Sequence, residues 1–242
     1  MAIPANLSQG QKSEKVRSIL VRGSLGVGML VSILSTFAYI SQSSMLERAK
    51  NGVELTKAEI ARNDGTIQMI AGVEVLLLIA TGTLWLMWQY RAYTNLKLAG
   101  TGETNMTPAS SVGWWFCPFI NLVRPIQITT ELFRRSENSN IHGIYSRATP
   151  PLFGFWWAFY ILRNFMGRIL GTSAIGETPS IEQLQNATTM GIVANMFDIV
   201  AGILALLVVT KITNIQQAMT SVEYTAPPSS PTPTVGGFDL GS

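Results

Sequence analysis

The sequence predicts an all-α protein: a four-transmembrane-helix bundle with an interfacial or re-entrant helix between spans two and three. Three observations lead to this prediction. Charged residues make up only 13% of the 242 residues, which is about half the usual share in soluble domains. They are sparse in four apolar stretches, each with the roughly 20 residues that a helix needs to cross a hydrocarbon core of about 30 Å. Between the second and third stretches lies an aromatic segment that two prolines interrupt.

The four predicted spans each contain glycine, serine or threonine, as helices that pack together in membranes do. They cover residues 19–40, 67–88, 152–170 and 190–212. Together they form one membrane domain, residues 19–212, preceded by a polar amino-terminal segment, residues 1–18. Residues 213–242 are expected to be a helix end and a disordered Pro/Ser-rich tail, because the tail has too little apolar surface to fold alone.

The first span follows Lys12, Lys15 and Arg17, so the alternative to a retained helix is a cleaved signal peptide. Its apolar core is long for such a signal, and no small-x-small cleavage site follows Ile40, so a retained helix is favoured. Small residues recur at every fourth position of this span: Ser24, Gly28, Ser32 and Thr36. We expect this stripe to pack within the chain rather than to form a dedicated dimer face.

The loop between the first two spans, residues 41–65, has helical character. Thr56 and Glu59 match a capping box, in which a helix begins. The charged residues around them would lie on solvated faces, which is commoner than a partner-binding face. The loop therefore predicts a short helix outside the membrane.

The second helix is expected to continue beyond the bilayer to about Leu98, with Gly100 just after its end. Residues 111–125 follow, and Pro118 and Pro125 break their short apolar core. Tryptophan and phenylalanine are typical of the headgroup region. This segment therefore predicts a helix in the cytoplasmic interface or a shallow re-entrant loop.

A further helix should begin at Pro125, because proline suits the first helical position. Its inward-facing residues would be Ile128, Leu132 and Phe133. On its other face, Glu131 would pair with Arg135 one turn later.

The distribution of lysine and arginine predicts the orientation. The amino-terminal segment and the loop between spans two and three are basic, whereas the loop between spans three and four has no lysine or arginine. The positive-inside rule therefore places both termini in the cytoplasm. The first loop has four basic and four acidic residues, which weakens this pattern but does not reverse it.

Several ionisable and amide side chains fall at one depth of the predicted bundle. At a rise of about 1.5 Å per residue, they lie in the outer half of the hydrocarbon core. The predicted intramembrane polar cluster consists of Glu74, Arg163, Asn164, Asn195 and Asp198. A charge at mid-depth costs roughly 2.5–3.5 kcal/mol unless it is paired. A proton, ion or ligand site would explain this cluster, but a structural clasp that fixes the helix register is favoured.

A second group lies at the cytoplasmic headgroups, where guanidinium groups with aromatic walls could hold an anionic lipid or a small anion. Its members are Arg91, Asn95, Trp114, Trp115, Asn121, Arg124 and Glu131. The favoured alternative is interfacial anchoring, together with an Arg–Glu contact that fixes the following helix to the end of span two.

The same region resembles a known family. Trp85, Arg91, Ala92, Tyr93 and Asn95 are followed by the run GWWFCPFINLVRP at residues 113–125. This pattern resembles a bacterial membrane family catalogued as domain-of-unknown-function family 4328. The resemblance implies several membrane helices over about residues 19–212 and an integral protein of a bacterial cytoplasmic membrane. Some members have an amino-terminal zinc ribbon, which is absent here, so no zinc is implied, and the family name implies no activity.

The residue inventory argues against an enzyme, a metal site or a cofactor. The chain has one cysteine, Cys117, and one histidine, His142, which is expected in an exposed loop. No nucleophile–base pair, metal-ligand spacing or Gly-rich phosphate motif is evident. Nucleic acid is not an expected partner, because the basic residues are dispersed along the membrane edges.

The sequence favours a structural or regulatory subunit of a membrane complex. Its expected partners are the lipid bilayer, anionic lipid and other membrane proteins. The alternative is a small transporter or channel that uses the Glu74/Arg163/Asp198 layer, although the internal duplication that many transporters show is not evident.

Overall fold

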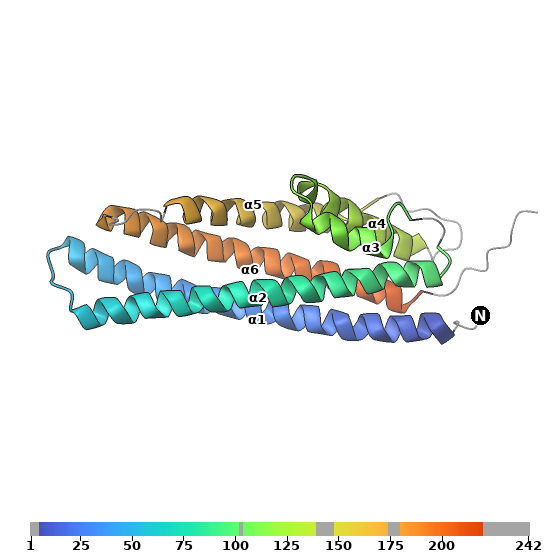
Figure 1. Cartoon of the computed structure of the whole chain (residues 1–242), viewed down its shortest axis with the longest axis horizontal. Coiled ribbons are helices and arrows are strands. Elements are labelled where there is room, and N and C mark those ends of the chain that lie inside the picture. Colours follow the sequence, from blue (N-terminus) through green and yellow to red (C-terminus); the bar gives the residue numbers. More distant parts are fainter. Residues whose placement is uncertain (1–4, 102–103, 139–147, 174–179, 220–242) are drawn as a thin grey trace, which may run out of the picture.

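The computed structural model describes residues 5–101, 104–138, 148–173 and 180–219, and it describes no side chains at 138 and 167–173. Within these ranges the protein is all helical and has no strand (Figure 1). The elements are α1 (Ala5–Lys50), α2 (Lys57–Leu98), α3 (Pro108–Gly113), the 3₁₀ turns η1 (Trp114–Phe116) and η2 (Ile120–Leu122), α4 (Arg124–Asn138), α5 (Pro151–Ser173) and α6 (Ile181–Gln217).

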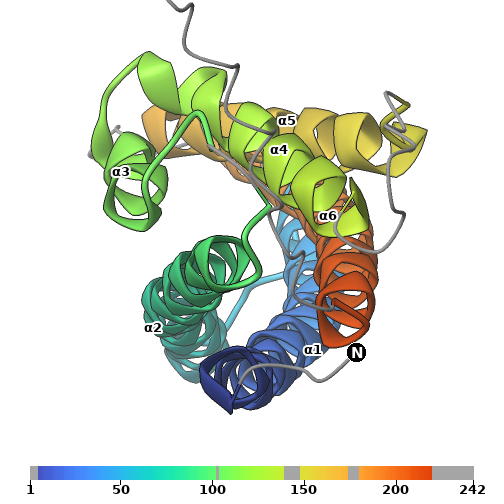
Figure 2. The same cartoon turned by 90° about the vertical axis from the view of Figure 1, so that its right-hand side faces the viewer.

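Three helices, α1, α2 and α6, are long and apolar enough to cross a membrane. Seen along the bundle axis, α2, α1, α6 and α5 follow one another around an arc (Figure 2). The short helix α3 packs against α2, and α4 packs against α6, α2 and α5. The shorter elements thus gather at the end of the bundle where α1 begins (Figure 1).

The sequence predicts a short helix in the first loop, and this prediction is wrong about the length of the helix. Instead, α1 and α2 extend through most of this region and form one hairpin with a short connection (Figure 1). The 46 residues of α1 are about 69 Å long at a rise of 1.5 Å per residue, more than twice the thickness of a hydrocarbon core. The hairpin therefore extends well beyond any bilayer that it crosses.

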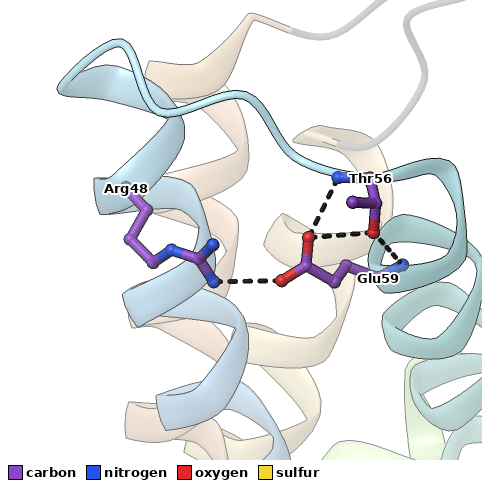
Figure 3. A network of polar contacts seen from close by, with 3 residues as sticks. All are labelled: Arg48, Thr56 and Glu59. Carbon is purple, nitrogen blue, oxygen red and sulfur yellow. Dashed lines mark hydrogen bonds and ion pairs between the residues drawn. The ribbon is translucent and has the colours of Figure 1, made fainter.

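The predicted capping box at the start of α2 is confirmed (Figure 3). The Glu59 backbone N–H donates to Thr56 Oγ1 at 3.2 Å, and the Thr56 backbone N–H donates to Glu59 Oε2 at 2.9 Å. Arg48 Nη1 lies 3.2 Å from Glu59 Oε1 and joins the end of α1 to the start of α2. The hydrogen bonds from Thr56, followed by that from Arg48, lower the pKa of Glu59. The Arg48–Glu59 ion pair thus lies beside the turn of the hairpin.

The inward face of α4 is confirmed, because Ile128, Leu132 and Phe133 are all buried. Glu131, however, does not contact Arg135 as predicted. Its Oε1 accepts a 2.6 Å hydrogen bond from the Asn105 backbone N–H, and its Oε2 accepts one of 3.2 Å from Tyr93 Oη. Glu131 therefore fixes α4 to α2 through a tyrosine.

Helix α6 passes close to α1 at Gly191, where an added Cβ would lie 2.8 Å from the Tyr39 ring. We expect Gly191→Ala to lower the free energy of unfolding by about 1–2 kcal/mol, because the ring must move from its packed position. The measurement is thermal unfolding in detergent micelles. Gly23→Ala is the control, since an added Cβ there meets nothing within 4 Å. Equal melting temperatures for the two variants would contradict the close approach.

Candidate functional site

A cavity of about 340 Å³ lies among α1, α2, α5 and α6, and residues of η1 and η2 complete its lining. Most of its wall is apolar. The predicted small-residue stripe of α1 contributes Ser24, Gly28 and Ser32 to this wall. Small side chains on α1 therefore leave space beside the helix at this level, in addition to allowing helix packing.

Three charged residues from three helices line this cavity: Glu74 on α2, Arg163 on α5 and Asp198 on α6. The Arg163 guanidinium forms an ion pair with the Asp198 carboxylate. Among the described residues, the buried Oε1 atom of Glu74 has no hydrogen-bond partner. The structure thus brings together the three charges that the sequence places at one depth. It joins two of them directly and leaves the third facing the same space.

The two asparagines of the predicted cluster take different positions. Asn164 is exposed, and its Nδ2 donates a 2.7 Å hydrogen bond to the Tyr160 carbonyl of its own helix. Asn195 is buried, and its Nδ2 has no partner among the described residues. Neither asparagine is part of the cavity wall. Of the predicted intramembrane cluster, the three charged residues therefore line the cavity and the two asparagines do not.

An aromatic cluster forms the part of the cavity wall next to η1. Trp85 stacks on Trp156 with ring centroids 5.2 Å apart. Trp115 meets Trp85 edge-on at 6.3 Å and Tyr160 edge-on at 6.1 Å. The four rings come from α2, η1 and α5, and all of them line the cavity.

Trp85 and Trp115 were expected at the membrane interface, and the wall that they form with Trp156 and Tyr160 was not predicted. The spacing of residues along α5 did indicate part of this wall. Trp156, Tyr160 and Arg163 recur at intervals of four and three residues, which places them on one face of α5. The sequence could not show that Trp115, from a different segment, would join that face.

Gln89 fixes the cluster to the following segment. Its Oε1 accepts hydrogen bonds from Trp85 Nε1 at 3.2 Å and Trp115 Nε1 at 3.3 Å. Its Nε2 donates to the Ser111 carbonyl at 2.8 Å. Gln89 is fully buried, so these bonds hold the Trp115 ring against the end of α2.

The residues of the second predicted site are distributed over several contacts. Arg91 Nε donates to the Gly10 carbonyl at 3.3 Å, and Asn95 Nδ2 donates to Gln216 Oε1 at 3.2 Å. Arg91 therefore faces α1, and Asn95 faces α6. The Arg124 guanidinium lies 5.3 Å from the Trp114 ring centroid, in cation–π geometry.

The remaining members of that group lie elsewhere. Trp115 and Asn121 line the cavity, and Asn121 Oδ1 is buried without a partner among the described residues. Glu131 joins α4 to α2, as described above. The geometry thus favours anchoring contacts for most of this group, and anionic lipid binding there stays a prediction.

A buried polar network, which the sequence analysis missed, lies where α1 begins. Glu14 is fully buried and its Oε1 accepts hydrogen bonds from Trp88 Nε1 at 2.6 Å and Thr213 Oγ1 at 2.7 Å. Its Oε2 accepts one from Gln217 Nε2 at 3.0 Å. Burial raises the pKa of Glu14, although these three donors oppose the shift. One carboxylate thus joins α1, α2 and α6.

Gln216 extends the network to α4. Its Nε2 donates to the Ala92 carbonyl at 3.0 Å and to Ser136 Oγ at 3.1 Å, and Gln11 Nε2 donates to its carbonyl at 2.8 Å. These bonds are internal to the fold. They position the helices relative to one another.

No group of three or more His, Cys, Asp or Glu side chains that could hold a metal ion occurs in the described part of the chain. His142 and residues 220–242 lie outside the described residues, so the predicted exposed histidine and most of the predicted disordered tail are not seen. Cys117 is half-buried in the link between η1 and η2. The cavity with its ion pair and aromatic wall is therefore the candidate site.

A family model described as "Domain of unknown function (DUF4328)" matches residues 51–214. The match includes most of the cavity wall but leaves out the contribution of α1. No curated protein and no solved structure matches the chain.

Proposed function

The chain belongs to the DUF4328 family, whose description gives no activity, and we propose its function from the cavity: an integral membrane protein that holds a small ligand inside its helical bundle. The proposal uses the same Glu74/Arg163/Asp198 layer as the transporter or channel alternative that the sequence suggests. The observation behind it is a cavity of about 340 Å³ bounded by two carboxylates and a guanidinium. Ligand sites in proteins typically occupy about 300–1,000 Å³ and combine apolar walls with a few polar groups.

The proposal uses four membrane spans with both termini in the cytoplasm. Helix α5 would be the fourth span, because its 23 residues are about 35 Å long at 1.5 Å per residue. Its Arg163 would then face the bundle interior and pair with Asp198 there, as intramembrane charges do. The positive-inside pattern supports the orientation.

The η1–η2 segment would lie in the cytoplasmic interface. Supporting this, Phe116 and Phe119 are 72% and 87% exposed, and Leu122 and Val123 are also exposed. Phe119 has a positive φ of 62°, which is a strained conformation for a non-glycine residue. Lipid would cover these apolar side chains and offset the strain.

The competing reading is a structural or regulatory subunit, in which the charges act only as a clasp. The Arg163–Asp198 pair suits a clasp. A clasp does not account for the unpaired Glu74 oxygen or for the open space beside it. A carboxylate with an unsatisfied oxygen inside a membrane is costly, and such groups often mark functional sites.

Cavity filling tests the proposal. Gly28 lines the cavity, and an added Cβ there meets nothing within 4 Å, so Gly28→Leu should occupy the space without disturbing the packing. Molecules that co-purify from native membranes would be extracted and identified by mass spectrometry. We expect at least one small molecule to be enriched with the wild type and lost in Gly28→Leu.

Gly23→Leu is the matched control, since Gly23 lies on the same helix, also faces open space and does not line the cavity. It should retain the molecule. If no small molecule is enriched and all three proteins retain the same protein partner, the subunit reading is correct. In proteoliposomes, proton or potassium flux that is lost in Asp198→Asn would show that the site also transports.

A further inference from the structure

The residues that line the cavity carry more negative than positive charge. Glu74 and Asp198 are acidic and Arg163 is basic, and the guanidinium is already engaged with Asp198. One carboxylate, that of Glu74, is left with a buried oxygen that has no hydrogen-bond partner among the described residues, and it interacts with Arg163 only through the Coulombic attraction between their charges. In a region of low dielectric constant, such a carboxylate favours a positively charged partner.

The aromatic wall suits a positive charge as well. The faces of tryptophan and tyrosine rings attract cations, and several rings around one space bind quaternary ammonium groups. Trp85, Trp115, Trp156 and Tyr160 all line the cavity, and they come from three segments. The contacts among them, at 5.2–6.3 Å between centroids, place them in one cluster. Trp85 lies eleven residues after Glu74 on α2, about 16 Å along the helix at 1.5 Å per residue, so a ligand must extend along the cavity to meet both the rings and the Glu74 carboxylate.

The rest of the wall is apolar and excludes strongly hydrated ions. Leu25, Leu77, Leu78 and Leu86 line the cavity, and together with small residues they make most of its surface apolar. A bare metal cation would need several oxygen ligands to replace its hydration shell, and the described residues hold no group of three or more His, Cys, Asp or Glu side chains that could bind one. An organic cation loses much less hydration and gains apolar contacts.

We propose that the cavity binds an amphipathic organic cation, with its ammonium group at the Glu74 carboxylate and its apolar part along the leucines and the tryptophan-rich wall. This inference rests on the proposed function, because it names the ligand class of the same cavity. In this proposal, the Glu74 carboxylate makes the cavity prefer a positively charged ligand over an uncharged one. Trp115 is the residue that completes the aromatic wall, and Arg163 keeps Asp198 from competing for the cation.

The test uses benzyltrimethylammonium as the probe, with full-length protein in detergent micelles. Equilibrium dialysis of the radiolabelled cation measures the dissociation constant, and empty micelles give the background. Two unlabelled competitors have a similar benzyl group: neopentylbenzene, the uncharged isostere, and benzylphosphonate, an anion. We expect the cation to bind about tenfold more tightly than the uncharged isostere, the size of effect that cation–π and ion-pair contacts give.

Two matched pairs of variants locate the site. Glu74→Gln should weaken cation binding about tenfold and remove the preference over neopentylbenzene, whereas Glu54→Gln, at an exposed position of the α1–α2 connection, should change neither. Trp115→Leu should weaken binding several-fold, whereas Trp114→Leu should not, because Trp114 does not line the cavity. If Trp115→Leu fails to fold, as seen by gel filtration, Trp115→Phe keeps a ring and should retain partial binding.

The outcomes separate the two proposals. Equal competition by neopentylbenzene, stronger competition by benzylphosphonate, unchanged binding in Glu74→Gln, or no binding of the cation by folded wild-type protein would each overturn this inference. The proposed function would still stand if a different molecule co-purified and was lost in Gly28→Leu. If no molecule co-purified and none of the three probes bound, both proposals would fail.

Discussion

Replacing Glu14 with alanine should lower the free energy of unfolding by about 2–4 kcal/mol. The change removes the acceptor for three donors, Trp88 Nε1, Thr213 Oγ1 and Gln217 Nε2. Trp88 is fully buried, and an unsatisfied buried donor costs about 1–3 kcal/mol. Thr213 Oγ1 lies 3.3 Å from Trp88 Nε1 and can satisfy it in part, which limits the loss. Thermal unfolding followed by tryptophan fluorescence in micelles measures the effect.

Two further variants test whether the network itself is responsible. Glu14→Gln keeps one oxygen but turns an amide donor toward the Gln217 amide, so its loss should be intermediate. Glu47→Ala, on the exposed part of the same helix, should change the melting temperature little. Equal behaviour of Glu14→Ala and Glu47→Ala would show that the buried carboxylate does not hold the helices together.

The same carboxyl group should make the stability of the folded protein depend on pH. Burial raises the pKa of Glu14 above its ordinary value of 4.5, so the folded state binds this proton more tightly than the unfolded state does. The contribution to stability is therefore fully present below the ordinary value and is lost as the pH rises through the raised pKa. The wild type should accordingly lose more stability than Glu14→Gln as the pH increases over that window.

Arg163→Leu should lower the free energy of unfolding by about 2–3 kcal/mol, because it leaves the Asp198 carboxylate unpaired inside the bundle. In the structure the two side chains are 34% and 23% exposed. This partial exposure keeps the expected loss below that of a fully buried pair. The measurements are thermal unfolding in micelles and the yield of monodisperse protein.

The double variant Arg163→Leu/Asp198→Leu separates pairing from packing. Removing both charges of a buried pair is often nearly neutral, whereas removing one is not. We therefore expect the double variant to recover most of the stability that Arg163→Leu loses. Arg62→Leu, at an exposed position of α2, is the control for loss of a charge. A double variant as unstable as Arg163→Leu would argue against the ion pair.

Much of the local structure follows from short patterns in the sequence. The capping box at Thr56 and Glu59 and the inward face of α4 are both present as predicted. These features depend on residues within one or two helical turns, where spacing alone fixes which side chains meet. The family also followed from a local run, GWWFCPFINLVRP, at residues 113–125.

The candidate site was predictable only in part. The depth of Glu74, Arg163 and Asp198 follows from the rise of a helix and the position of each residue in its span. Which of them pair does not follow, because that depends on the rotation of three helices about their axes. The aromatic wall and the Glu14 network were missed for the same reason. Each joins residues from segments far apart in the chain, such as Glu14 with Thr213.

The sequence by itself determined the helices, their apolar lengths, the capping box of α2 and the level at which the charges lie. These properties depend on composition and on periodicity along one helix. Only the tertiary structure decided that α1 and α2 form one long hairpin, that Arg163 pairs with Asp198 and leaves Glu74 facing a cavity, and that Trp115 closes that cavity beside Trp85. The physical reason is that side chains on different helices meet only after packing has fixed how each helix is rotated.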